Sequence, residues 1–199
     1  MRSGVGLFVL KVLLAYGLLV VAPWQGLKDA YAGIFRAAGR CLFASFGSNG
    51  VVEFTAAPPN KPPWDTQVRL VNRALSRAWT MNYSAWRTGY LPTAALTALV
   101  LATPVSWLRR GWAMVFGLAI VHAFVALRVA IAAFRWFREV DLFVFGGLGN
   151  WLVDLSFEVV SVSTVTSCVV PVLIWGAVTF RRSDGPRLLG RGRSESAFP

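Results

Sequence analysis

Carboxylate and thiol side chains interrupt apolar stretches of this chain, and their chemistry needs an explanation. In "DLSFEVVSVSTVTSC", residues 154–168, Asp154 and Glu158 are four residues apart and therefore share one face of a helix. An ionised carboxylate in hydrocarbon is strongly unfavourable unless it is paired or hydrated. These two acids are therefore either catalytic groups or one half of a network of ion pairs.

Arginines earlier in the chain can supply the other half of such a network. Arg128 and Arg135 are seven residues apart on one helical face, and the chain then turns back toward Asp154. On two antiparallel helices, at about 1.5 Å per residue, the arginines and the acids fall at similar depths. We predict structural intramembrane ion pairs of Glu158 with Arg128, and of Asp154 with Arg135 or Arg138.

Cys41, Cys168 and His122 are the other groups with catalytic potential. A single histidine excludes a multi-histidine metal site, and no CxxC, HExxH or glycine-rich phosphate loop occurs. A nucleophilic thiol needs a base or a cation beside it, which the neighbouring sequence does not supply. A lone buried histidine is more typical of a packing residue than of a proton carrier. We predict no catalytic residue, metal or cofactor.

The composition places these residues in a membrane protein. Of 199 residues, 56% are hydrophobic and 15% are charged, and a soluble domain averages about 25% charged residues. The formal net charge is +11, with arginines spread among and beside the apolar stretches. This pattern favours contact with anionic lipid headgroups and excludes nucleic acid as the expected partner.

The pattern predicts an all-α integral membrane protein with about four transmembrane helices, an interfacial amphipathic helix and a small extracytoplasmic strand-containing cap. In the segment that follows the first span, Leu27, Tyr31, Ile34, Ala38 and Leu42 line one helical face. An alternation through Val68, Leu70 and Asn72 predicts a strand. The expected divisions are an N-terminal anchor at 1–22, the amphipathic helix and cap at 23–88, a three-helix transmembrane bundle at 89–180 and a disordered basic cytoplasmic tail at 181–199.

Arginines in short loops predict the orientation. Arg109 and Arg110 mark one cytoplasmic loop, and Arg181 and Arg182 begin a second basic segment. With four spans, both termini lie in the cytoplasm and the segment 23–88 lies outside the inner membrane of a bacterium. Small residues four and three apart on the third span predict a helix-packing stripe opposite Arg128. This stripe consists of Ala119, Ala123, Ala126, Ala130 and Ala133.

The run "NYSAWRTGYLPTAALTALVLATPVSWLRRGWAMVFGLAIVHAFVALRVAI" resembles the bundle of the exosortase and archaeosortase families. These families are membrane transpeptidases that use a cysteine, an arginine and a histidine on successive spans. The resemblance matches Arg128 to the family arginine. No cysteine precedes the second span at the expected place, where "SAWRTGY" stands instead, and no histidine follows Arg128. Transpeptidase chemistry is therefore not carried over.

A second resemblance covers more of the chain. One N-terminal span, an external strand-bearing segment and the run "WRTGYLPTAALTALVLATP" are similar to the exosortase H-associated membrane proteins. This likeness implies a non-enzymatic accessory subunit of an envelope protein-sorting or assembly system, with a membrane protein, such as an exosortase, as its partner. One alternative is a divergent cysteine transpeptidase that uses Cys168 or Cys41 with Arg128 and His122. A further alternative is a small transporter or proton-coupled subunit with Glu158 and His122 as relay groups.

Overall fold

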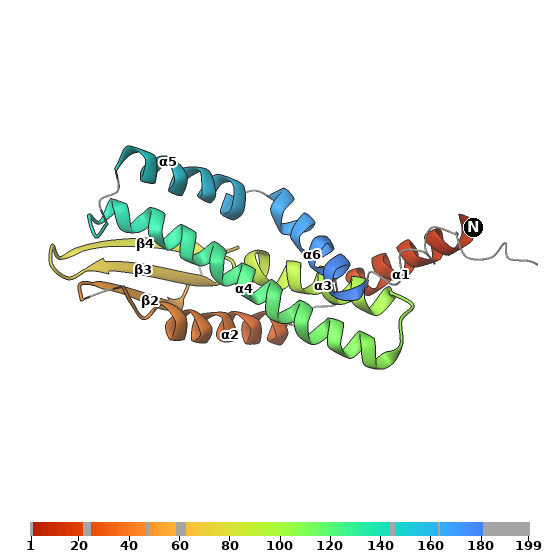
Figure 1. Cartoon of the computed structure of the whole chain (residues 1–199). Coiled ribbons are helices and arrows are strands. Elements are labelled where there is room, and N and C mark those ends of the chain that lie inside the picture. Colours follow the sequence, from red (N-terminus) through yellow and green to blue (C-terminus); the bar gives the residue numbers. More distant parts are fainter. Residues whose placement is uncertain are drawn as a thin grey trace, which may run out of the picture.

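The fold joins a group of apolar helices at one end to an antiparallel sheet at the other, and one long helix runs along both (Figure 1). The computed structural model describes residues 2–21, 25–46, 48–58, 63–143, 146–162 and 164–180. The expected basic tail at 181–199 lies outside the described residues. The helices are α1 (Arg2–Val21), α2 (Gln25–Phe43), α3 (Leu91–Ala102), α4 (Trp107–Glu139), α5 (Gly147–Ser156) and α6 (Thr164–Thr179).

Four strands form the sheet as a simple meander in the order β1-β2-β3-β4. They are β1 (Ser45–Phe46), β2 (Gly50–Ala56), β3 (Thr66–Asn72) and β4 (Arg77–Tyr83), each antiparallel to the next. Val68 pairs with Phe54 and Leu70 with Val52, so these four apolar side chains share one face. The opposite face carries Glu53 and Arg69, which form an exposed ion pair. The predicted alternation through Val68, Leu70 and Asn72 is confirmed, because all three are buried.

The apolar face of the sheet packs against the last third of α4. Val129, Ala133 and Phe137 of α4 join the sheet residues in one buried cluster. The Asn72 side chain donates a 2.9 Å hydrogen bond to the carbonyl oxygen of Val140, which holds the end of the helix to the sheet. Trp79 of β4 also stacks on Trp136, with ring centroids 5.3 Å apart.

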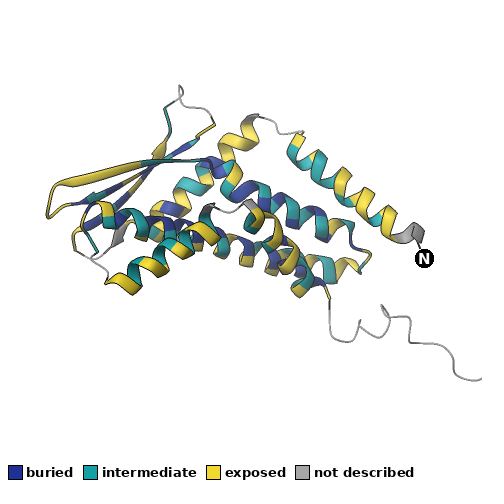
Figure 2. Ribbon diagram, turned by 90° about the horizontal axis from the view of Figure 1, so that it is seen from above, coloured by how far each residue is buried: buried dark blue, intermediate teal, exposed yellow. Residues whose placement is uncertain are grey.

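The first two thirds of α4 have different neighbours. Gly117 and Val121 pack toward α3 and α6, where Leu96, Val100 and Ile174 complete a second buried cluster. Large apolar side chains elsewhere on this part of α4 are exposed, among them Phe116 at 55% and Leu127 at 51%. Exposed residues also run along the helix that starts at the N-terminus, α1 (Figure 2). Protein contacts therefore leave much of the apolar surface of these helices uncovered.

Helix α2 packs on the sheet through only one of its sides. Gly39 allows this close approach, because a Cβ there would lie 2.6 Å from the Phe54 ring. The predicted apolar face is on another side, where Leu27, Ile34 and Leu42 are exposed at 41%, 65% and 63%. The amphipathic helix is thus present, and most of its apolar face is open, whereas Tyr31 of this face packs edge to face on Tyr90.

Two π-helical segments, η1 (Trp86–Tyr90) and η2 (Phe157–Val162), interrupt the regular helices. Asp65 fixes the start of η1, since its carboxylate accepts hydrogen bonds from the backbone N–H groups of Ala85 at 2.9 Å and Trp86 at 3.3 Å. The helix α3 that follows ends before Pro104, in agreement with the extended backbone of Thr103. Segments 147–161 and 165–179 meet at an angle of 73°.

The prediction of an all-α membrane protein with about four spanning helices is wrong. The chain contains a four-stranded sheet, and α4 is the only helix in the described residues that is by itself long and apolar enough to cross a membrane. At most two further spans arise, if each of the bent pairs α1–α2 and α5–α6 is one span. The apolar periodicity was correctly assigned to helices. It did not reveal that α3 has 12 residues and α6 has 16, each less than the 20 or so that a span needs.

Candidate functional site

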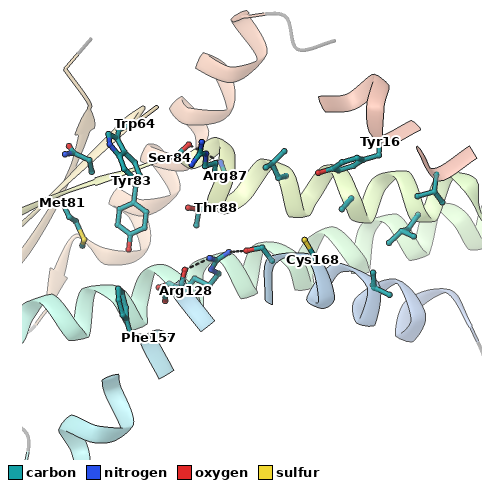
Figure 3. A pocket seen from close by; sticks show the side chains of 18 of the residues that line it. Tyr16, Trp64, Met81, Tyr83, Ser84, Arg87, Thr88, Arg128, Phe157 and Cys168 are labelled. Carbon is teal, nitrogen blue, oxygen red and sulfur yellow. Dashed lines mark hydrogen bonds between the residues drawn. The ribbon is translucent and has the colours of Figure 1, made fainter. Parts of the chain in front are cut away.

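A cavity of about 900 Å³ lies where the sheet meets the apolar helices. Its walls come from α1, the end of β4, η1, α3, α4, η2 and α6 (Figure 3). Toward α1 and α3 the lining is apolar, with Leu13, Ala95 and Leu99, whereas toward the sheet it includes Asn82 and Tyr83. The described lining contains two arginines, Arg128 and Arg87, and no acidic residue.

Arg128 is the central polar group of this cavity, and it is only 7% exposed. Its guanidinium donates to the Ser167 hydroxyl at 2.7 Å and to the Ser161 carbonyl oxygen at 2.7 Å. Its Nε is buried without a hydrogen-bond partner. Within the described residues Arg128 forms no ion pair, so its positive charge is hydrogen-bonded but not neutralised.

The helix break at η2 explains why a backbone carbonyl group is free to accept a hydrogen bond from Arg128. At the end of a helix, carbonyl groups lose their partners in the next turn and must find others. The Thr166 hydroxyl donates to the Val159 carbonyl at 2.6 Å, and Arg128 donates to that of Ser161. Both π-helical segments line the cavity, through Arg87 and Thr88 of η1 and through Phe157 and Ser161 of η2. Such segments are frequent at functional sites.

Tyr83 adds a second polar group on the sheet side of the cavity, with its ring directed toward Arg128 (Figure 3). Burial raises the pKa of the Tyr83 phenol above its ordinary value, and the opposing effect of the Arg128 charge is smaller. The phenol therefore stays protonated at neutral pH and can donate a hydrogen bond. A guanidinium and a neutral phenol together form a donor set suited to an anionic oxygen.

The predicted pairing of Asp154 is present beside the cavity. Asp154 forms ion pairs with both Arg135 and Arg138, the latter at 3.2 Å. Asn150 accepts a further hydrogen bond from Arg138 at 3.3 Å. Arg135 also lies over the Phe157 ring, 4.9 Å from its centroid. These contacts tie α5 and η2 to the end of α4.

The predicted pair of Glu158 with Arg128 is absent. Glu158 is exposed, and Arg128 bonds to Ser161 and Ser167 instead. The helical repeat placed Asp154 and Glu158 on one face, as four-residue spacing requires in an α-helix. The π-helical turn begins at Phe157 and changes the angular position of the residues after it, so the two acids do not face the same partners.

The residues of the enzyme hypothesis are only partly brought together. Arg128 and Cys168 line the same cavity, and Cys168 is accessible. Cys41 is exposed on α2 and His122 on α4, and neither is among the lining residues. His122 Nδ1 lies 2.8 Å from the Leu118 carbonyl oxygen, within its own helix. No described contact joins His122 to Glu158, the relay pair of the transporter hypothesis.

The alanine stripe is not the main packing face of α4. Ala119 and Ala123 are exposed, Ala126 and Ala130 are half-buried, and Ala133 is buried against the sheet. The buried face contains Gly117, Val121, Val125 and Arg128 itself. Small residues permit close packing but do not show which side has a neighbour, and here the neighbours lie on the Arg128 side.

Sequence reasoning missed the cavity residues that come from outside the apolar helices. Trp64, Tyr83 and Arg87 all fell within the predicted cap segment at 23–88, so nothing connected them with Arg128. Because the helical repeat matched Arg128 to Glu158, the sequence carried no sign that this arginine lacks a carboxylate partner. Among the described residues, no three His, Cys, Asp or Glu side chains gather where they could hold a metal ion.

Comparison with known proteins adds no relative. No protein-family profile, curated protein or solved structure matches the chain. The resemblance to exosortase-associated proteins therefore stays a prediction, and the functional argument depends on the cavity.

Proposed function

We propose that this chain is a non-enzymatic membrane protein of the bacterial inner membrane that acts by binding. In this proposal it is an accessory subunit of an envelope protein-sorting or assembly system of the exosortase type. The observation that carries the binding role is the cavity around Arg128, which offers hydrogen-bond donors and apolar walls. The described lining contains no histidine and no carboxylate that could activate the Cys168 thiol as a base.

The length of α4 supports the membrane placement. Its 33 residues extend about 50 Å, whereas the hydrocarbon core of a bilayer is about 30 Å thick. The sheet covers the part from Val129 onward, and the part before Arg128 exposes apolar side chains. We place residues 111–127 in the hydrocarbon, with Arg109 and Arg110 at one membrane–water boundary and the sheet-covered end beyond the other. Arg128 then lies near the membrane–water boundary, where a charged side chain is much less unfavourable than at the centre.

Affinity purification from the native membrane tests the accessory role. The tagged full-length protein is extracted in a mild detergent, and co-purifying proteins are identified by mass spectrometry. We expect one membrane protein of the envelope machinery in near-stoichiometric amount. Recovery of the chain without such a partner, from cells in which the machinery is active, would contradict the accessory role.

A divergent transpeptidase is the second candidate, because Arg128 and Cys168 share the cavity. Substitution Cys168→Ala separates the two functions, and Cys41→Ala is the matched control at an exposed site on α2. The accessory role predicts that processing of a sorted envelope protein is unchanged in both variants. Loss of processing in Cys168→Ala alone would favour the enzyme.

A further inference from the structure

The cavity around Arg128 has the charge of an anion site and the walls of a lipid site. Arg128 is buried, hydrogen-bonded and without a carboxylate, and Arg87 at the rim adds a second positive charge. A buried cation with no counter-ion is unfavourable unless an anion arrives from outside the chain. Within the described residues, the protein supplies no such anion at this place.

The polar and apolar parts of the cavity are separated along its length. Arg128, Tyr83 and Ser84 lie toward the sheet, whereas farther along the helices the lining residues of α1 and α3 are apolar apart from Tyr16 (Figure 3). From Leu91 to Leu99, two lining residues of α3, the apolar wall extends for about 12 Å. A ligand that satisfies both parts has an anionic head and an apolar chain.

The volume of the cavity favours a lipid over a whole membrane-spanning helix. A membrane-spanning helix about 30 Å long and 10 Å wide would occupy on the order of 2,400 Å³. The cavity holds about 900 Å³, within the usual range of about 300–1,000 Å³ for small-ligand sites. It can therefore enclose one chain and a headgroup, and it cannot enclose a helix.

We propose that this cavity binds one anionic phospholipid of the surrounding membrane, with the phosphate at Arg128 and Tyr83 and an acyl chain between α1, α3 and α6. This inference rests on the proposed binding role of the cavity. An arginine fork matches the oxygens of a phosphate, and the protonated phenol of Tyr83 donates a further hydrogen bond. Within the described residues, Nη1 and Nη2 of Arg128 each donate one hydrogen bond to the protein, so each nitrogen keeps one N–H group for a ligand.

Tryptophan quenching by brominated lipids tests the proposal, because Trp64 and Trp136 line the cavity. The full-length protein in a neutral maltoside detergent is titrated with brominated phosphatidylglycerol and, separately, brominated phosphatidylcholine. We expect saturable quenching at about tenfold lower concentration for the anionic lipid. The variant Trp64→Phe identifies the part of the signal that comes from the cavity. Equal quenching by both lipids would overturn the proposal.

Charge variants locate the headgroup. Arg128→Gln and Arg87→Gln are each expected to weaken phosphatidylglycerol binding, by about tenfold for Arg128, since one charge-assisted contact is lost. Arg73→Gln, an exposed arginine outside the cavity, is the control and is expected to bind normally. If Arg128→Gln fails to fold, the binding of phosphatidylglycerol by Arg87→Gln and the lipid selectivity of the unmodified protein still test the proposed headgroup site. Unchanged binding in a folded Arg128→Gln variant would overturn the site.

Competition and native mass spectrometry distinguish a bound phospholipid from a free phosphate ion and from a bound polypeptide. Short-chain dioctanoyl-phosphatidylglycerol is expected to compete, whereas inorganic phosphate at the same concentration is not. Competition by phosphate alone would show that the acyl chain is not held. Native mass spectrometry of the purified protein should show one added phospholipid mass, and an added polypeptide in its place would contradict the proposal. Failure to recover a protein partner, with lipid selectivity intact, would contradict only the accessory role.

Discussion

The two parts of helix α4 are built from the same kinds of residue and have different surroundings. From Trp107 to Leu127 the helix exposes large apolar side chains, whereas from Val129 to Phe137 such side chains are buried under the sheet. Arg128 lies between the two parts. Apolar composition therefore does not by itself reveal whether a helix is covered by other parts of the protein or left exposed; the sheet, α5 and η2 cover only the last part of α4.

The largest effect is expected from a charge placed under the sheet. Leu70→Asp puts a carboxylate at a fully buried position of β3, with no partner in the surrounding apolar cluster. We expect a loss of about 4 kcal/mol or more in the free energy of unfolding, measured by denaturation in detergent. The neighbouring Arg69→Ala, at an exposed position, should change it by no more than about 0.5 kcal/mol. Similar effects of the two variants would contradict the buried face.

A charge on the uncovered part of α4 tests whether that part of the helix lies in the membrane. If Phe116 faces hydrocarbon, Phe116→Asp should disfavour membrane insertion by about 3 kcal/mol. The measurement is the fraction of the protein recovered in the membrane after expression. Leu75→Asp is the control, because Leu75 is 52% exposed in the turn between β3 and β4. Equal membrane recovery of both variants would contradict the placement of residues 111–127 in the bilayer.

Removal of the shared carboxylate of the ion-pair cluster should have a smaller effect. Asp154→Asn leaves Arg135 and Arg138 without their partner, and the partly exposed pairs predict a loss of about 1 kcal/mol. Glu158→Gln is the matched control and should be neutral, since Glu158 is exposed. Thermal unfolding of both variants measures the difference. A larger loss in Glu158→Gln would restore the pairing that the helical repeat predicted.

The smallest effect concerns the pH dependence of stability. Because burial raises the native pKa of Tyr83, its phenol ionises more readily in the unfolded state, and stability falls as pH rises above about 10. Tyr83→Phe should make this decline shallower, by a fraction of the limiting value of about 1.4 kcal/mol per pH unit. Unfolding measured at neutral pH and above pH 10 provides the test. An identical decline in both proteins would contradict the burial of the phenol.

Local patterns were sufficient for some parts of this fold. The alternation through Val68 and Leu70 identified β3, and the reversal of the chain near Arg138 indicated the partners of Asp154. Both features depend on short-range geometry, on period two in a strand and on antiparallel neighbours. The number of helices long enough to cross a membrane could not be obtained in this way, because breaks at η1 and η2 shorten the helices without changing their hydropathy.

The apolar helices, the strand alternation, the excess of arginine and the lack of a metal-binding motif could all be recognised from the amino-acid sequence alone. Each of these follows from residue types at fixed spacing along one segment. Two features are visible only in the folded chain. Arg128 bonds to two serines instead of Glu158, and Tyr83, Arg87 and Cys168 lie around the same cavity as Arg128. The physical reason is that these contacts join segments distant in the chain, where a single π-helical turn is enough to change which side chains meet.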